Sequence, residues 1–255
     1  PYVVIAPSYM VYSIDFNQFI HTHIDSDADI TLLYHAVDNA KEAYLTCNVL
    51  DLNRQKGVQA IEANHGNKKN QNIYMDTCIM KTELFISLVK EAKKLSSMYT
   101  LTDIINDKCE TLDIRGVAHK GFFASVTDFP SYYKANMDLL NYKAAQELYH
   151  EDLPIYTRTN DSCPTQYFDS ADVKNSVISN GCQIEGTVEN SVIGRGCVIK
   201  KGAVVRNSVV LAEVTVGENV HVENEVVDKW AKLVRKKEIV SPAENPGYIK
   251  REDTL

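Results

Sequence analysis

Aliphatic residues recur at about every sixth position in the C-terminal third of the chain. The segments Asn-Ser-Val-Ile, Asn-Ser-Val-Ile, Asn-Ser-Val-Val and Asn-Glu-Val-Val begin at Asn175, Asn190, Asn207 and Asn224, so their spacings are 15, 17 and 17 residues. Three six-residue repeats make one β-helix coil of about 18 residues, and the spacing corresponds to one slightly shortened coil. This periodicity predicts a parallel β-helix over residues 169–240.

Within each predicted coil, aliphatic side chains face the lumen and Asn, Ser and Gly occupy the corners. We expect Ile184, Ile199 and Val205 to lie in the lumen. Cys182 and Cys197 hold equivalent repeat positions, so we expect them to stack in neighbouring coils as reduced core thiols.

Residues 1–150 alternate strand-like and helix-like segments, a pattern typical of an α/β domain. We expect Asp15, Thr82 and Asp128 to cap three helices, the second with apolar residues three and four positions apart. Residues 151–168, which contain two prolines, are expected to link this domain to the β-helix, and residues 241–255 to form an irregular tail. Apolar runs predict strands at 3–6, 30–34, 44–50, 58–61, 73–80 and 122–126.

Composition excludes several classes of protein. With 44% hydrophobic and 24% charged residues, the chain is expected to be globular rather than disordered or fibrous. Its net charge of -7 and its lack of a dense Lys/Arg face argue against nucleic acid or an anionic membrane as the main partner. No run approaches the roughly 18 apolar residues of a membrane span, so we expect a cytoplasmic protein. Because Pro1 directly precedes an apolar strand, we also expect a fragment of a longer protein.

Two motifs and the hexapeptide segment together point to one family. Residues 3–16 are similar to a strand and loop of the form VVILxGDHIYKxDY, and residues 132–139, Tyr-Tyr-Lys-Ala-Asn-Met-Asp-Leu, are similar to a helix of the form YWKANLDL. With residues 173–227, these segments resemble ADP-glucose pyrophosphorylase (glucose-1-phosphate adenylyltransferase) over nearly the whole chain. The resemblance implies a partial Rossmann-like nucleotidyltransferase domain followed by a left-handed β-helix of hexapeptide repeats.

The chain departs from this family at the positions that carry its chemistry. In the family, two Asp residues hold the Mg²⁺ that neutralises charge while the nucleotidyl group of ATP is transferred. These positions match Tyr9 and Ser125, whose neutral hydroxyl groups cannot replace two carboxylates as ligands of a hard dication. The family's sugar-phosphate lysine has no counterpart near residues 62–66, and its glycine-rich phosphate loop has none in this sequence. We therefore expect no catalytic, cofactor-binding or metal-binding residue in this chain.

These losses resemble those of the non-catalytic, regulatory GlgD-type subunit, which accompanies a catalytic subunit in some bacteria. The resemblance implies a role in ADP-glucose synthesis from ATP and glucose 1-phosphate for glycogen biosynthesis. Its partner is then the catalytic subunit of ADP-glucose pyrophosphorylase, which uses Mg²⁺ and ATP, in a homo- or hetero-oligomer such as a tetramer. In the alternative interpretation, the chain is an active nucleotidyltransferase whose metal ligands are displaced to residues such as Asp15 or Asp128.

A cluster near residue 25 has the composition of a metal site. His21, His23, Asp25, Asp27 and Asp29 fall within nine residues. Imidazolium groups at the end of a helix are favoured by its dipole, and carboxylates are common in the following turn. We therefore interpret the cluster as a solvated helix end rather than a metal site.

Two single residues of the predicted β-helix have conspicuous side chains. In acyltransferases built on such a prism, a histidine between coils acts as a general base. His221, however, alternates with the inward-facing Val220 and Val222, so we expect it to point outward. Trp230 stands where the repeat ends, and we expect it to close that end of the prism.

Overall fold

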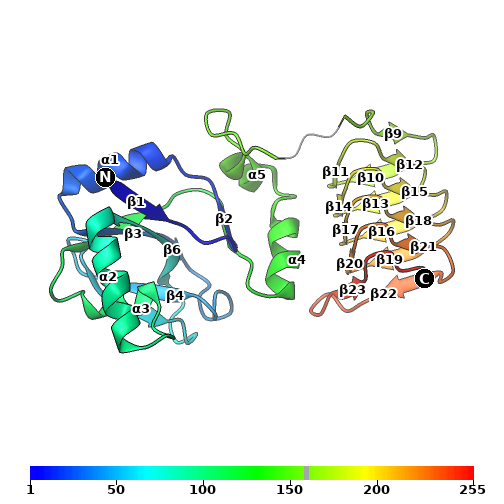
Figure 1. The fold of residues 1–255 in the computed structure, drawn as a ribbon. Coiled ribbons are helices and arrows are strands. Elements are labelled where there is room, and N and C mark those ends of the chain that lie inside the picture. Colours follow the sequence, from blue (N-terminus) through cyan, green and yellow to red (C-terminus); the bar gives the residue numbers. More distant parts are fainter. Residues whose placement is uncertain (158–160) are drawn as a thin grey trace. The chain divides into compact units, whose positions relative to one another are not determined.

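The computed structural model describes residues 1–157 and 161–255, which form two compact units (Figure 1). The first unit comprises residues 1–127 and 151–153, and the second comprises residues 128–150 and 154–255. This division differs from the boundary expected at residue 150, because two helices between residues 128 and 150 group with the second unit. The expected linker, 151–168, includes residues 158–160, which lie outside the described residues. Among the described residues, no helix is long and apolar enough to cross a membrane.

The first unit is built on a mixed six-stranded sheet made of β1 (Tyr2–Ile5), β3 (Ile30–Val37), β4 (Asn48–Leu52), β5 (Val58–Ala63), β6 (Gln71–Lys81) and β7 (Ile114–Ala118). The strand order is β5-β4-β6-β3-β7, with β1 paired to the end of β6. Only β3 and β7 run parallel to each other. The strand expected at 44–50 begins later, because Tyr44 has a φ of 60°, outside the extended range.

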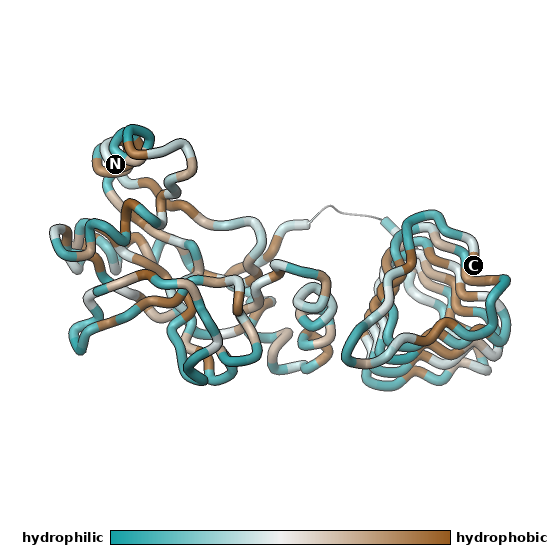
Figure 2. Tube along the Cα trace, turned by 90° about the horizontal axis from the view of Figure 1, so that it is seen from below, coloured by the Kyte–Doolittle hydropathy of each residue, from teal (hydrophilic) through white to brown (hydrophobic). Residues whose placement is uncertain are grey.

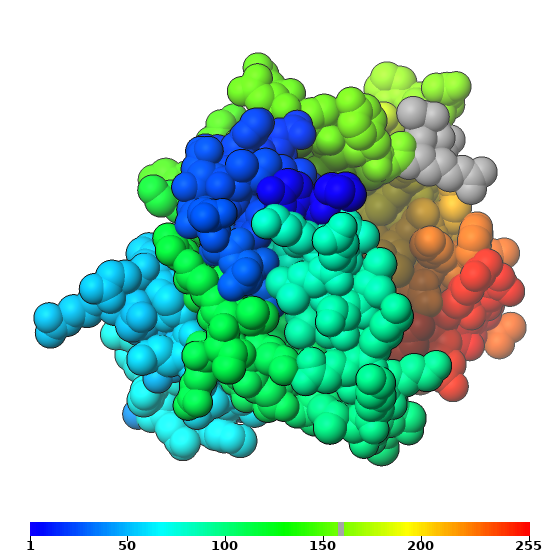
Figure 3. All heavy atoms as spheres, turned by 60° about the vertical axis from the view of Figure 1, so that its left-hand side comes forward, coloured from blue at the N-terminus to red at the C-terminus, as the bar shows by residue number. Residues whose placement is uncertain are grey.

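Three helices cover this sheet: α1 (Phe16–Ser26), α2 (Thr82–Leu95) and α3 (Leu101–Asp107). The Asp15 carboxylate caps α1, as predicted, by accepting the backbone N–H groups of the first turn. The N-cap of α2 is Lys81, so the prediction that Thr82 caps this helix is wrong. Figure 3 shows the N-terminal strand and α1, in blue, beside α2, in blue-green. The sheet and its helices confirm the predicted α/β class.

The second unit contains a parallel β-solenoid, as predicted, whose coils have the three-sided outline seen in Figure 2. Each side of the prism is a five-stranded parallel sheet. The first side consists of β9 (Gln166–Tyr167), β12 (Gln183–Ile184), β15 (Val198–Ile199), β18 (Thr215–Val216) and β21 (Lys232–Leu233). The second consists of β10 (Asp172–Lys174), β13 (Thr187–Glu189), β16 (Val204–Arg206), β19 (His221–Glu223) and β22 (Glu238–Val240). The third consists of β11 (Val177–Ile178), β14 (Val192–Ile193), β17 (Val209–Val210), β20 (Glu225–Val227) and β23 (Gly247–Ile249).

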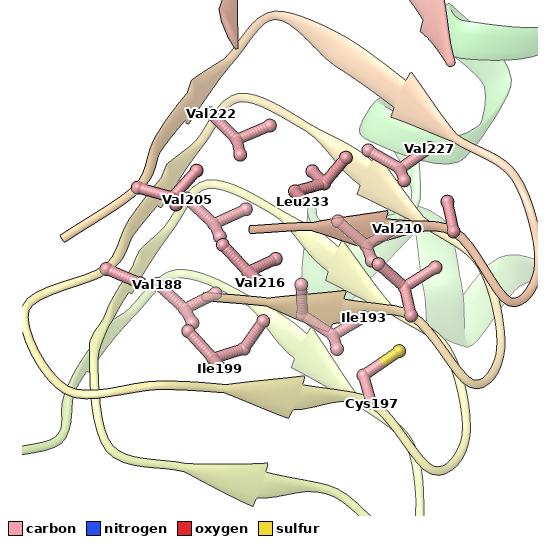
Figure 4. Close-up of a cluster of buried hydrophobic side chains, with 14 of the residues drawn as sticks. Val188, Ile193, Cys197, Ile199, Val205, Val210, Val216, Val222, Val227 and Leu233 are labelled. Carbon is pink, nitrogen blue, oxygen red and sulfur yellow. The ribbon is translucent and has the colours of Figure 1, made fainter. Parts of the chain in front are cut away.

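The lumen of the prism is filled by aliphatic side chains in stacked columns (Figure 4). Ile184, Ile199 and Val205 are 0% exposed, which confirms the predicted register. The Cys182 and Cys197 thiols are also buried, unoxidised, and lie one residue before the paired residues of β12 and β15. Each of these two thiols donates to a backbone carbonyl, so neither leaves an unsatisfied group in the lumen.

One corner of the prism is formed by the repeated Asn-Ser pair. Asn175, Asn190, Asn207 and Asn224 all have positive φ, between 42° and 57°, a conformation that Asn tolerates better than most residues. Each following serine hydroxyl accepts the N–H of the equivalent residue in the next coil and donates to a carbonyl two residues before it. The serines thus form a ladder of hydrogen bonds along the corner.

Glu225 takes the place of serine at the end of this ladder. Its side chain is almost fully buried, its Oε1 accepts the Ser241 hydroxyl at 2.6 Å, and its backbone N–H donates to Ser208 Oγ. Gly247 leaves space for this carboxyl, since a Cβ there would lie 2.2 Å from Glu225 Oε2. Burial raises the pKa of the Glu225 carboxyl.

We expect Glu225→Gln to raise the stability of the solenoid at pH 8 by about 1 kcal/mol. The folded-state pKa of Glu225 is raised, so the folded protein favours the protonated, neutral carboxyl group. The stabilisation from this carboxyl group is therefore complete below the unfolded-state pKa of about 4.3, and it is lost as the pH rises through the folded-state pKa. The gain from the substitution should therefore shrink towards pH 4. Urea unfolding followed by Trp230 fluorescence measures it, with the exposed Glu218→Gln as the charge-matched control. A gain that is equal at pH 4 and pH 8 contradicts the assignment.

Two helices, α4 (Phe129–Asp138) and α5 (Tyr142–Leu148), belong to the second unit. Asp128 caps α4, as predicted, and forms a reciprocal capping box with Ser131. α4 packs against β17, and its Tyr133 hydroxyl donates to the Asn207 carbonyl at 2.5 Å. On the third side of the prism, each strand has two adjacent apolar residues, and adjacent residues of a strand point to opposite faces. Val209 and Val226 therefore face outward, and another element must pack against them to bury them. This need explains why α4 groups with the solenoid.

The C-terminal residues differ from the irregular tail expected at 241–255. β23 pairs with β20, Thr254 bridges to Lys232, and Leu255 packs against the lumen residues. Trp230 is 42% exposed at a corner and stacks under the Arg251 guanidinium, 4.2 Å from the ring centre. The expectation that Trp230 closes the prism is therefore wrong, because apolar residues of the last segment fill that end of the lumen.

Candidate functional site

A short ribbon brings together Tyr9 and Ser125, the two residues that the sequence resemblance matches with metal-binding Asp residues. β2 (Met10–Tyr12) pairs antiparallel with β8 (Phe123–Ser125), and Met10 lies opposite Ser125. The Tyr9 carbonyl continues this pairing by accepting the Val126 N–H at 2.8 Å. Tyr9 and Ser125, 116 positions apart in the sequence, are therefore neighbours on the ribbon.

The Tyr9 hydroxyl donates a hydrogen bond to Asp76 Oδ2. Burial and this bond raise the pKa of Tyr9, so the phenol stays neutral. Burial also raises the pKa of the Asp76 carboxyl, although the bond from Tyr9 opposes that rise. The other oxygen, Oδ1, is buried and has no hydrogen-bond partner among the described residues. Asp76 is thus the carboxyl group that contacts Tyr9.

Ser125 is buried and engaged by a thiol rather than by a carboxylate. Cys47 Sγ donates to Ser125 Oγ over 3.3 Å, and burial raises the pKa of the Cys47 thiol. On the other strand of the ribbon, Tyr12 Oη lies 2.6 Å from Thr77 Oγ1. Apart from the Asp76 carboxyl, the side chains in these hydrogen bonds are therefore neutral hydroxyl and thiol groups.

Two histidines lie at the carboxyl ends of the parallel strands β3 and β7. His119 Nε2 lies 3.0 Å from the Ser13 carbonyl, which can only accept, so this nitrogen carries a proton. In neutral His119 the Nδ1 is then an acceptor, and it lies 3.2 Å from His35 Nδ1. Burial, followed by the neighbouring His119, lowers the pKa of His35 to about 4. The pair is neutral at pH 7 and ties the loop after β2 to the sheet.

Asn64 lies in the segment where the family carries its sugar-phosphate lysine. Its side chain is buried, and its Nδ2 donates to the carbonyls of Ala40, Ala43 and Tyr44 at 2.9 to 3.3 Å. Its Oδ1 accepts the Gly66 N–H at 3.0 Å. The amide is fully used in holding two loops together, so it offers neither a charge nor a free donor to a phosphate.

The residues at these positions do not fit a Mg²⁺ ion. Tyr9 and Ser125 are neutral and already hydrogen-bonded, and one oxygen of the single carboxyl, Asp76, is taken by Tyr9. Mg²⁺ requires octahedral oxygen ligands and is usually anchored by one or two ionised carboxylates. Within residues 1–157 and 161–255, no group of three or more His, Cys, Asp or Glu side chains is arranged to hold a metal ion.

The two carboxylates weighed as displaced ligands both serve as helix caps. Asp15 accepts from Asn17 and Gln18 at the start of α1. Asp128 accepts the Ser131 N–H at 2.8 Å at the start of α4. Hydrogen bonds with Ser131 lower the pKa of Asp128. Neither carboxylate lies beside Ser125 in the hydrogen-bond network of the ribbon.

In the acidic cluster near residue 25, the structure corrects the role of one histidine. His21 and the three aspartates are exposed, whereas His23 is 1% exposed and its Nδ1 lies 2.7 Å from Thr31 Oγ1. Burial and the nearby Lys81 lower the pKa of His23, so the expectation of a cationic imidazole at the helix end is wrong for it. His221 lies outside the lumen, as expected, with Nε2 3.0 Å from a Glu223 carboxylate oxygen.

Reasoning from the sequence did not find Asp76 or the pair of histidines. One signal for Asp76 was available: it is the only charged residue between Ile73 and Met80, a largely apolar segment of β6. A buried charge in such a strand requires a partner, and Tyr9 supplies it. His35 and His119 gave no signal, because 84 residues separate them.

Comparisons with known proteins agree with both parts of the fold. Residues 165–245 match the model of the GlmU-like C-terminal hexapeptide family. The chain is 30% identical to the glucose-1-phosphate adenylyltransferase of Fervidobacterium nodosum, over 89% of the chain and 54% of that protein. It is 31% identical to the glycogen biosynthesis protein GlgD of Geobacillus stearothermophilus, over 80% of the chain and 49% of that protein.

The chain belongs to the glucose-1-phosphate adenylyltransferase and GlgD family. A further member of this family, GlgD of Bacillus subtilis, is 27% identical over 92% of the chain and 67% of its own length. The chain spans about half the length of the first two relatives. The sequence resemblance predicts that Tyr9 and Ser125 match the two metal-binding positions of the glucose-1-phosphate adenylyltransferases.

Proposed function

We propose that the chain is a non-catalytic, regulatory subunit of glucose-1-phosphate adenylyltransferase in cytoplasmic glycogen biosynthesis. The observation that carries this proposal is the loss of both metal-binding carboxylates, because Tyr9 and Ser125 form neutral hydrogen bonds at those positions. The buried Asn64 adds support, because it cannot replace the lysine that contacts the sugar phosphate. The similarity to two GlgD proteins also agrees with a role in glycogen biosynthesis.

A non-catalytic member of this family can act only through another protein. We therefore propose the catalytic subunit of glucose-1-phosphate adenylyltransferase as its partner, in a mixed oligomer such as a tetramer. Mg²⁺, ATP and glucose 1-phosphate then bind to the catalytic subunit. Regulation requires that association of the two subunits changes the affinity of the catalytic subunit for its substrates or effectors, or changes its catalytic rate.

Mixing experiments test this proposal. The protein and a catalytic subunit from the same organism are mixed, and we expect light scattering to show an assembly larger than either component. We expect ADP-glucose synthesis by the mixture, or its response to effectors, to differ about fivefold from that of the catalytic subunit alone. A catalytic subunit whose mass and kinetics are unchanged by the mixture would falsify the proposal.

A further inference from the structure

The second side of the prism carries a column of alternating charges. Its five strands, β10, β13, β16, β19 and β22, stack in parallel and follow one another down the solenoid in Figure 1. The middle residue of each strand packs in or against the lumen, as the valines of β13, β16 and β19 show in Figure 4, so the first and third residues point outward. The third residues of the first four strands are Lys174, Glu189, Arg206 and Glu223.

The first residues of the same strands form a second outward column. It consists of Asp172, Thr187, Val204, His221 and Glu238. Positive and negative side chains are therefore interspersed on this side of the prism, although the whole chain has a net charge of -7. A second negatively charged molecule is not repelled from such a mixed surface as it is from the rest of the protein.

The alternating column is open to solvent. The Lys174 and Arg206 side chains are 65% and 45% exposed, and their ion pairs with Asp172 and Glu189 measure 2.8 and 3.2 Å. Exposed pairs of this kind contribute little to the stability of a single chain. Stability alone therefore does not account for a regular alternation over four coils.

The other two sides of the prism differ from this one. The outward residues on the first side read Gln183, Val198, Thr215 and Lys232, without alternation of charge. The third side has apolar outward residues and packs against α4. The alternation is thus a property of the second side and not of the repeat itself.

The charged column is complementary to its own reverse. A two-fold axis parallel to the strands, passing between β13 and β16, places Lys174 opposite Glu223 of a second copy and Glu189 opposite Arg206. The symmetry makes each of these contacts twice. The same axis places Asp172 opposite His221, and Thr187 opposite Val204.

The charges also select one register. If the axis lies on β16 instead, Arg206 faces its own copy and Glu189 faces Glu223. If it lies on β13, Glu189 faces its own copy and Lys174 faces Arg206. Like charges placed opposite each other oppose association, so only the axis between these strands is favourable.

We propose that the second side of the prism docks a second copy of this chain, face to face and with the coils running in opposite directions. Five strands about 4.8 Å apart make a surface only about 24 Å tall, so the interface is small. We expect a weak dimer with a dissociation constant on the order of 10 µM. The inference does not depend on the proposed regulatory function, because it concerns only contacts between copies of this chain.

Charge reversal in two separate variants tests the contact. Sedimentation equilibrium measures the dimer from about 1 to about 500 µM protein. Arg206→Glu and Glu189→Arg each place like charges opposite each other twice, and we expect each variant alone to associate at least about tenfold more weakly.

An equimolar mixture of the two variants separates this contact from effects within one chain. In a mixed dimer, the substituted position 206 of one variant faces the substituted position 189 of the other with opposite charge, and the two unsubstituted residues also face each other. We expect the dissociation constant of the mixed dimer to return to within about threefold of that of the unsubstituted protein. The ion pair between Glu189 and Arg206 within one chain is lost in both variants, and mixing cannot restore it.

The matched control is Lys232→Glu, which reverses an exposed charge on the first side and should leave association unchanged. Unsubstituted protein that stays monomeric, single variants that dimerise normally, or a mixture without recovery overturns the proposal. Circular dichroism establishes that each variant is folded. If either reversal prevents folding, Lys174→Glu and Glu223→Lys form the same kind of pair at the ends of the column and must give the same recovery on mixing. These measurements use neither ADP-glucose synthesis nor a catalytic subunit, so they leave the regulatory role to its own test.

Discussion

The unsubstituted protein, which has Tyr9 and Ser125, is expected to convert ATP and glucose 1-phosphate into ADP-glucose at least about a thousandfold more slowly than a catalytic relative. Without two metal-binding carboxylates, nothing at these positions neutralises the charge that develops on the transferred phosphoryl group. Pyrophosphate release at saturating Mg²⁺ measures the rate. The Fervidobacterium nodosum enzyme, assayed under the same conditions, is the reference.

Restoring the carboxylates tests the cause of this inactivity. Tyr9→Asp with Ser125→Asp is expected to give only a trace of activity, because Asn64 still leaves the sugar phosphate without its lysine. The single variant Asp15→Asn is the control, since that carboxylate only caps α1. If the unsubstituted protein synthesises ADP-glucose at a rate within about tenfold of the reference enzyme, the expectation is wrong. That result would favour the alternative of an active nucleotidyltransferase with displaced metal ligands.

Truncating a lumen residue of the solenoid is expected to destabilise it strongly. Ile199 is 0% exposed between the equivalent residues of the neighbouring coils, Ile184 and Val216. Ile199→Ala should lower the free energy of unfolding by about 2 to 5 kcal/mol, from lost apolar burial and from the cavity left in a narrow prism. Urea unfolding followed by Trp230 fluorescence measures this, because the only Trp of the chain lies in the solenoid.

The adjacent residue provides the matched control. Lys200 points away from the lumen and lies 3.5 Å from the Glu185 carboxylate in a solvent-exposed ion pair. Such pairs contribute little, so Lys200→Ala should change stability by less than about 0.5 kcal/mol. Similar losses for the two variants would mean that the assignment of inward and outward positions is incorrect.

The solenoid could be predicted from the sequence because its geometry repeats. Each coil places Val or Ile at the same two or three positions, so the columns through Ile184, Ile199 and Val205 follow from the spacing alone. The packing of α4 against the outer face of the solenoid could not be predicted from the spacing of the repeats. Repeats such as Asn-Ser-Val-Val put one of two adjacent valines outside, and only a distant helix shows how that residue is buried.

In the candidate site, the sequence predicted only the residues that lie within motifs similar to those of the family. The resemblance placed Tyr9 and Ser125 at equivalent functional positions, and the β2–β8 pairing makes them neighbours. Asp76 reaches the same place through a bulge, and periodicity cannot reveal a bulge because it is a local departure from the two-residue repeat of a strand. The sequence-based interpretation of His23 was wrong because its burial depends on Thr31 in β3 and Tyr2 in β1, which both lie outside α1.

The packing of α4 on the third side of the prism determines which residues must stay with the solenoid when it is transferred to another protein. The hexapeptide repeats begin near residue 165, yet a piece cut there would bare the outward valines Val209 and Val226 to water. An exposed apolar strip along a row of parallel strands promotes aggregation. Recombination that moves this solenoid between proteins must therefore carry residues 128–150 with it, and the transferable unit begins at a helix that has no repeat of its own.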